Sequence, residues 1–178
     1  MAALAAIPDP EMPISIVDLG LVEQVQLEPS PVRPDSAVAT ITLLPTFVGC
    51  PALDMIREDV RRVVGALPGV EQVQVRFVHE PRWTVDRITE AGRASLRAHG
   101  VTVPERGECA IGHTDPPGGS IPRPVPMTVS AGSTVAPVPC PFCGSVSTHL
   151  DSPFGPTRCR MIYYCETCRN SFEHLKRV

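Results

Sequence analysis

Residues 38–56 read Val-Ala-Thr-Ile-Thr-Leu-Leu-Pro-Thr-Phe-Val-Gly-Cys-Pro-Ala-Leu-Asp-Met-Ile, and this stretch decides the fold of the first half of the chain. Its first seven residues are rich in β-branched and apolar side chains, which predicts a strand. Gly49 and Pro51 then predict a tight turn followed by a helix start. Apolar residues recur after the turn at spacings of three and four, which predicts an amphipathic helix; they are Leu53, Ile56, Val60, Val63 and Leu67.

The segments on either side of this unit complete a domain. Apolar and polar residues alternate over 21–27 and again over 73–77, and each run predicts a further strand. A second helix is expected to begin with Thr84 as its N-cap and to end before Gly100. The pattern therefore predicts a small two-layer α/β domain over residues 1–103, within an α+β chain.

Composition limits the class of protein. A net charge of −3 and the lack of a basic stripe do not favour nucleic-acid binding. No apolar run reaches the roughly 18 residues of a membrane span, and the apolar start carries no basic residues before Pro8, so we expect neither a membrane anchor nor a secretory signal. Seven cysteines, four of them in two C-x-x-C pairs, indicate metal or thiol chemistry in a reducing cytoplasm.

The C-terminal part of the chain divides into a linker and a small module. Residues 104–139 are rich in proline and glycine, which predicts an extended linker. Residues 140–178 carry the two C-x-x-C pairs, which predict a zinc-ribbon-like β module whose ligands are Cys140, Cys143, Cys165 and Cys168. Four thiolates also suit iron or an iron–sulfur cluster, but a closed tetrahedral set favours structural Zn²⁺.

The remaining cysteines have less defined roles. Cys159 lies six residues before Cys165. It could be a ligand that exchanges with one of the four, but a thiol that binds no metal is the favoured interpretation. Cys109 and His113 have a C-x-x-x-H spacing, which is a weak indication of metal binding.

Cys50 lies at the turn between the predicted strand and helix. A thiol at a helix N-terminus is expected to have a lowered pKa, although a small packed residue is an equally good interpretation. The acidic turn from Asp9 to Pro13 and the later Asp18 could supply a carboxylate near this thiol, but the sequence does not place them together. No histidine lies near Cys50 in sequence to activate it, which argues against a thiol enzyme.

Several of these motifs together resemble a known family. Asp9-Pro10-Glu11-Met12-Pro13, the run Ile16–Val22 and the turn Thr46-x-x-Gly49-Cys50-Pro51 resemble the SufT-type iron–sulfur assembly domain. Trp83-Thr84-x-Asp86, the cysteine pairs and the run from Phe154 to Arg160 resemble its PaaD branch, from aerobic phenylacetate degradation. In this chain Pro156 and Arg160 replace the usual Ser and Lys, and the N-terminal helix common in the family is expected to be truncated or absent.

The resemblance implies a non-catalytic accessory protein of the 1,2-phenylacetyl-CoA epoxidase system. Its partners would be the oxygenase and reductase components, and its cargo a transient iron ion or iron–sulfur cluster. The implied transfer site is Cys50 with Thr46, Asp18 and Glu11. A stable structural subunit of the epoxidase complex is the alternative.

Overall fold

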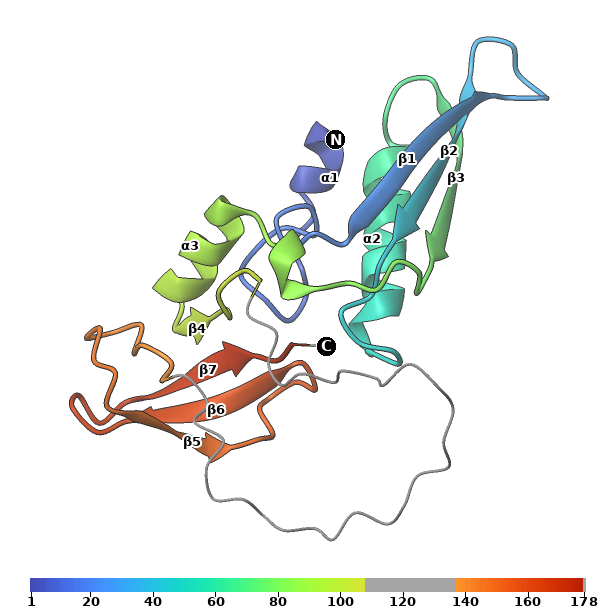
Figure 1. The fold of residues 1–178 in the computed structure, drawn as a ribbon. Coiled ribbons are helices and arrows are strands. Elements are labelled where there is room, and N and C mark those ends of the chain that lie inside the picture. The colour runs from blue at the N-terminus through green and yellow to red at the C-terminus, as the bar shows by residue number, and fades with distance from the viewer. Residues whose placement is uncertain (108–136, 178) are drawn as a thin grey trace, which may run out of the picture.

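The computed structural model describes residues 1–107 and 137–177. It contains two sheets, one in each half of the chain, with a helical segment between them (Figure 1). The predicted linker over residues 104–139 lies for the most part outside the described residues, and so do Cys109 and His113. None of the described helices has the length and apolar character needed to cross a bilayer.

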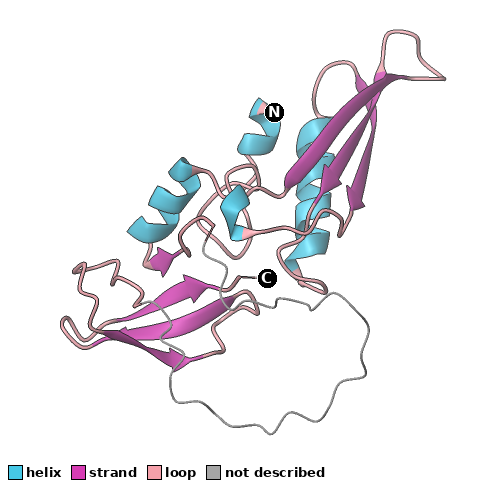
Figure 2. Cartoon of the chain, viewed as in Figure 1, coloured by secondary structure: helices cyan, strands magenta, loops and turns pink. Residues whose placement is uncertain are grey.

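The first sheet has the strand order β1-β2-β3, formed by β1 (Val22–Pro29), β2 (Ala37–Leu43) and β3 (Val70–Phe77). β1 and β2 pair antiparallel, whereas β2 and β3 pair in parallel, with Ile41 opposite Val75. A parallel pair requires a crossover connection, and helix α2 (Ala52–Gly65) provides it. Figure 2 shows this helix running alongside the three strands.

The buried side of α2 differs slightly from the predicted stripe. The fully buried positions are spaced by four, at Ala52, Ile56, Val60 and Val64, while Leu67 lies beyond the helix end and is 41% exposed. Leu53 and Val63 are only partly buried at the margins of this face. The predicted helix is present, and its buried face is centred on the predicted stripe, at Ile56 and Val60.

The helical segment after β3 begins later than predicted. Thr84 precedes only a single 3₁₀ turn, η1 (Val85–Arg87), and the chain is extended again at Ile88. Helix α3 (Glu90–Ala98) starts after Thr89, whose hydroxyl accepts a hydrogen bond from the Gly92 amide at 3.0 Å. The prediction of a helix from Thr84 was therefore wrong, because the stronger N-cap lies five residues further on.

The chain begins with a four-residue helix, α1 (Ala2–Ala5), and an irregular segment follows it. This segment is held by the Pro8–Ser15 bridge and by a hydrogen bond from the Asp9 amide to the Ile14 carbonyl at 2.8 Å. It places Ile7, Ile16 and Leu19 in the main core together with Met12 of the acidic turn, and it leaves Pro10 and Pro13 of that turn exposed.

The second sheet has the order β4-β7-β6-β5, formed by β4 (Val101–Thr102), β5 (Thr148–Ser152), β6 (Arg160–Cys165) and β7 (Ser171–Leu175). We call β5, β6 and β7 the ribbon. β4 follows α3 directly and pairs in parallel with β7, so a strand from the first half of the chain completes the ribbon's sheet. Cys159 and Leu175 of the C-terminal part are buried in the same core cluster as α2 and the first sheet. One end of the ribbon thus belongs to the core of the first half, while its cysteine end packs in a separate cluster.

Candidate functional site

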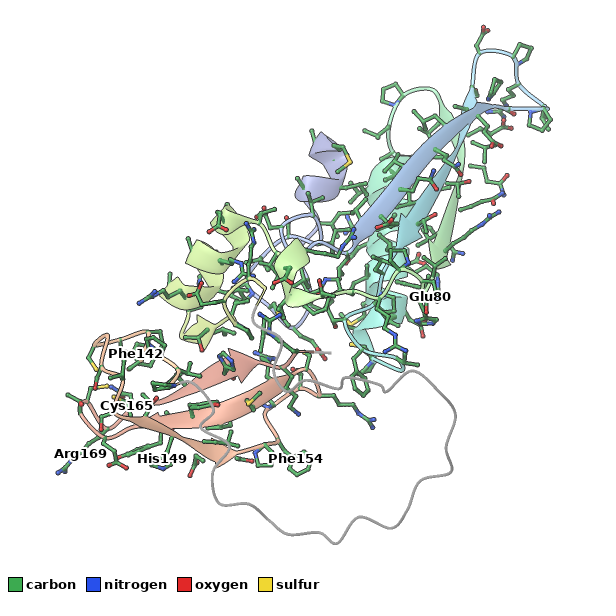
Figure 3. The ribbon with its side chains drawn as sticks, viewed as in Figure 1. Glu80, Phe142, His149, Phe154, Cys165 and Arg169 are labelled. Atoms are coloured by element: carbon green, nitrogen blue, oxygen red, sulfur yellow. The ribbon has the colours of Figure 1, made fainter. Side chains whose placement is uncertain are left out.

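The four cysteines of the tail converge at one end of the ribbon. The Sγ atoms of Cys140 and Cys168 are 3.6 Å apart, and so are those of Cys143 and Cys165. All four sulfur atoms lie within 4.8 Å of one another. Figure 3 shows Cys165 at this end, together with Phe142 and Arg169, whereas Phe154 marks the other end.

Two similar turns aim these sulfur atoms inward. The Gly144 amide donates to the Cys140 carbonyl at 2.9 Å, and the Arg169 amide donates to the Cys165 carbonyl at 2.8 Å. Both residues that close the turns have a left-handed backbone conformation, with φ of 73° at Gly144 and 59° at Arg169. Glycine adopts this conformation freely, while a non-glycine residue does so at a cost that the surrounding structure must offset.

Backbone amides also prepare part of the cluster for metal binding. A hydrogen bond from the Asn170 amide is the main cause that lowers the pKa of Cys168 to about 6. Amide hydrogen bonds, first that of Cys168, lower the pKa of Cys165 as well. Since thiolates are the metal-binding form, the chemistry and spacing of this set suit a tetrahedral metal ion with four sulfur ligands.

Cys50 lies at a second site, in the turn immediately before α2. Its thiol donates a long hydrogen bond to Oε2 of Glu11, with a sulfur–oxygen distance of 3.9 Å. Both residues line a pocket of about 210 Å³, whose other walls are Thr46, Phe47, Pro51, Pro156, Thr157, Arg158 and Cys159. The turn itself requires Gly49, which has a φ of 79°.

The prediction that the pKa of the Cys50 thiol is lowered was wrong. Burial of the thiol is the main cause that raises its pKa, and the nearby charges of Glu11 and Asp9 add to the effect. A hydrogen bond from the Ala52 amide at the start of α2 acts in the opposite direction but is weaker. The helix N-terminus is therefore outweighed by desolvation, and a metal must displace a proton from this sulfur.

The structure brings three of the four predicted transfer residues together. Glu11, Thr46 and Cys50 line the same pocket. Asp18 is not among its walls, because its carboxylate accepts hydrogen bonds from Thr89 Oγ1 at 2.7 Å and from Ser15 Oγ at 2.9 Å. Asp18 thus ties the N-terminal segment to the start of α3.

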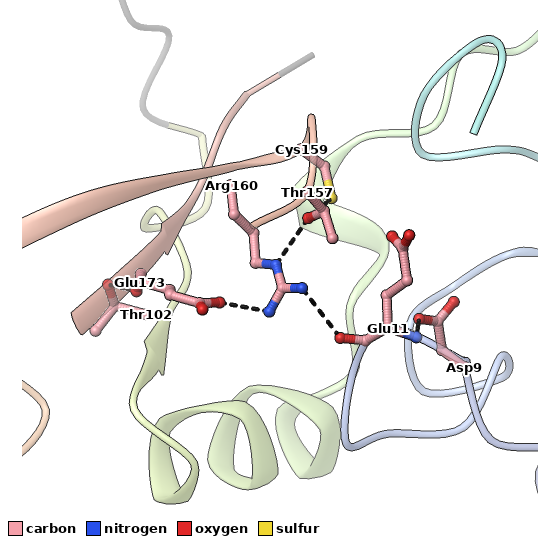
Figure 4. A network of polar contacts seen from close by, with 7 residues as sticks. All are labelled: Asp9, Glu11, Thr102, Thr157, Cys159, Arg160 and Glu173. Atoms are coloured by element: carbon pink, nitrogen blue, oxygen red, sulfur yellow. Dashed lines mark hydrogen bonds and ion pairs between the residues drawn. The ribbon is translucent and has the colours of Figure 1, made fainter. Parts of the chain in front are cut away.

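Sequence reasoning missed the contribution of the ribbon to this pocket. Thr157, Arg158 and Cys159 come from the loop before β6, more than 100 residues after Cys50. Arg160, at the start of β6, reaches the acidic turn, where its Nη2 donates to the Glu11 carbonyl at 3.2 Å (Figure 4). The Phe154–Arg160 motif was the one indication in the sequence that these residues matter. Nothing in the sequence indicated that the motif lies next to Cys50.

Comparison with known proteins identifies the chain. Residues 1–76 match the model of an iron–sulfur cluster assembly protein, and residues 124–176 match the PaaD zinc beta ribbon domain. A protein of Escherichia coli (strain K12), which is named as a component of 1,2-phenylacetyl-CoA epoxidase, is 34% identical over 98% of this chain and 89% of its own length. The chain belongs to the PaaD family.

Further relatives match about half of this PaaD protein. The Fe-S protein maturation auxiliary factor YitW of Bacillus subtilis (strain 168) is 32% identical over 54% of the chain and 88% of its own length. A solved structure from Bacillus anthracis, titled as domain of unknown function DUF59, shares 34% identity and a TM-score of 0.45, covering 53% of this chain and 85% of that one. The family models and named relatives support an accessory role related to iron–sulfur assembly, with a metal-binding tail.

Proposed function

We propose that this PaaD protein delivers iron or an iron–sulfur cluster to the oxygenase or reductase component of a phenylacetyl-CoA epoxidase, in the cytoplasm and without catalysing a reaction itself. The observation that carries the proposal is the pocket before α2, where the Cys50 thiol faces the Glu11 carboxylate at 3.9 Å. The family model of an iron–sulfur cluster assembly protein matches residues 1–76, the segment that holds both residues.

Binding at this pocket would proceed by proton displacement. The Cys50 thiol gives up its proton as its sulfur binds iron, and the Glu11 carboxylate is placed to accept that proton or to act as an oxygen ligand. The Thr46 hydroxyl lines the same pocket and can serve as a hydrogen-bond donor to the cargo. A site that offers only a few protein ligands in an open pocket suits a carrier, because the cargo must leave again.

The tail site has a different role in this proposal. Its four cysteines hold Zn²⁺ permanently, since all four tetrahedral positions are filled by protein sulfur and none is left for an exchanging ligand. The zinc then maintains the ribbon that forms one wall of the Cys50 pocket.

The test compares two substitutions of Cys50 in a strain that grows on phenylacetate. Cys50→Ser and Cys50→Ala should keep the zinc content of the protein and abolish growth, and the isolated reductase or oxygenase should be deficient in iron. Cys109→Ser is the matched control for the loss of one thiol and should support growth. Normal growth and normal iron content with both Cys50 variants would exclude the delivery role.

A stable structural component of the epoxidase is the second candidate, and the name of the Escherichia coli relative favours it. Such a component would copurify with the oxygenase in a fixed ratio and would tolerate Cys50→Ser. A delivery factor would be absent from the mature complex.

A further inference from the structure

The Cys50 pocket contains a second thiol, and it comes from the ribbon. Cys159 is 4% exposed and lines the pocket with Cys50. It does not belong to the tail cluster, because it is buried with the core of the first half of the chain, whereas Cys140 and Cys165 pack in a separate cluster. β6 spans Arg160 to Cys165, so the length of this strand separates Cys159 from the zinc end.

The surroundings of Cys159 hold it firmly at the pocket wall. The Thr157 hydroxyl lies 3.2 Å from its sulfur, and its carbonyl accepts a hydrogen bond from the Lys176 amide at 2.8 Å. Arg160 then fixes this loop against the acidic turn. Its Nε donates to Thr157 Oγ1 at 2.8 Å, its Nη2 donates to the Glu11 carbonyl, and its Nη1 pairs with Glu173 (Figure 4).

This arrangement gives the pocket charges that suit an anionic cargo. Arg158 lines the pocket on the ribbon side, and the neighbouring Arg160 guanidinium, which is itself paired with Glu173, adjoins the loop that carries Cys159. On the other side Glu11 is the carboxylate that lines the pocket among the described residues. An iron–sulfur cluster with thiolate ligands carries net negative charge, which nearby arginines stabilise.

We propose that Cys159 is the second thiolate ligand of the cargo, so that the ribbon and the assembly domain bind one cluster between them. This inference rests on the proposed delivery function and names a further ligand for it. On loading, each thiol loses one proton and its sulfur forms a bond to iron, and no electron is transferred.

The spacing of the donors favours a cluster over a single ion. In the described part of the chain, the tail cysteines are the one set of three or more candidate ligands whose atoms all lie within 4.8 Å of one another. Cys50, Glu11 and Cys159 do not form such a set, although the Cys50 sulfur lies only 3.9 Å from the Glu11 carboxylate. A cluster accepts wider spacing, since its ligands bind different iron atoms.

The test is anaerobic reconstitution of the zinc-loaded full chain with ferrous iron alone and with ferrous iron plus sulfide. The wild-type protein should acquire cluster absorption only when sulfide is present. Cys159→Ser and Cys159→Ala should keep their zinc but retain cluster iron roughly 10–100-fold more weakly, as is typical even when a group supporting a metal ligand is removed. Cys109→Ser should behave as wild type.

The outcomes separate this inference from the delivery function. If the Cys159 variants match wild type in iron content and spectrum while Cys50→Ser loses both, Cys159 is not a ligand and the delivery function stands. If Cys50→Ser also retains the cluster, the pocket is not the cargo site and both proposals fail. Loading the wild-type chain should also slow alkylation of Cys50, a readout that needs no variant; an unchanged Cys50 rate would place the cluster outside the pocket and overturn the inference.

Discussion

Arg160 is the side chain that connects the most distant parts of the molecule. It is 8% exposed and contacts Thr157 in its own loop, Glu173 on β7 and the carbonyl of Glu11, 149 residues earlier in the chain. A guanidinium can reach three partners at once because its donors point in fixed, different directions, whereas lysine offers a single point charge.

Replacing Arg160 should separate the effect of its charge from the effect of its shape. Arg160→Met leaves the Glu173 carboxylate without its partner and should lower the free energy of unfolding by about 3 kcal/mol. Arg160→Lys, which keeps the positive charge, can keep the Glu173 pair and should lose only about 1 kcal/mol with the other hydrogen bonds. Urea unfolding of the zinc-loaded proteins measures both. Equal losses would show that the guanidinium geometry, and not the charge, stabilises the junction.

At the residue scale, the sequence located the candidate ligands that lie within recognisable motifs. The C-x-x-C pairs and the Gly49-Cys50-Pro51 turn could be found because local spacing defines them. The environment of Cys50 could not be predicted, since the rise of its pKa depends on burial and on carboxylates brought in from the N-terminal segment. Asp18 belongs to a motif as well, but its hydrogen bonds to Ser15 and Thr89 lie outside the pocket.

At the scale of elements, the shortest strand makes the connection between the halves. β4 has two residues, and Thr102 Oγ1 lies 2.8 Å from His174 Nδ1 on β7. The His174 ring also meets the edge of Tyr163 with 5.4 Å between centroids. Burial, with a smaller effect of the Arg177 charge, lowers the pKa of His174 to about 4.

This histidine should make stability fall with acidity. From its ordinary pKa of 6.5 downward, the unfolded chain binds a proton that the folded chain does not accept until about pH 4. The contribution of His174 is therefore complete above pH 6.5 and should fall by roughly 1.4 kcal/mol between about pH 7.5 and 5.5. His174→Gln, which cannot titrate, should flatten the pH dependence by this amount in urea unfolding. Parallel profiles for the two proteins would show that His174 is already charged when folded.

Elements with a long hydrophobic period were predicted correctly. Elements whose conformation depends on tertiary contacts were not. The strand–helix–strand unit through β2, α2 and β3 was predicted, since each element has its own hydrophobic period. β4 could not be found, because two residues have no period and their only reason to be extended is the partner strand β7. Thr84 and Thr89 are both plausible N-caps in sequence, but in the structure only the Thr89 side chain accepts a capping hydrogen bond.

At the scale of the whole molecule, the two halves are more closely joined than the sequence suggests. The proline-rich segment between the first domain and the cysteine module predicts an extended linker. In the structure Leu175 and Cys159 are buried in the core of the first half, and β4 completes the ribbon's sheet. The reason is that a small metal-stabilised ribbon leaves apolar side chains that can be buried only against a neighbour.

Removing the zinc should therefore alter the Cys50 pocket from a distance. Without metal the ribbon is expected to unfold, because structural zinc sites supply folding energy directly. Thr157, Arg158 and Cys159 would then leave the pocket, and Cys50 should react faster with an alkylating reagent when measured by mass spectrometry of its peptide.

Trp83, the chain's single tryptophan, reports on the other half, since it is buried and donates to the Leu19 carbonyl at 2.9 Å. Its emission should stay unshifted on chelation, and added zinc should restore slow labelling of Cys50. A red shift of Trp83 together with zinc loss would show instead that the first half cannot keep its fold without the ribbon.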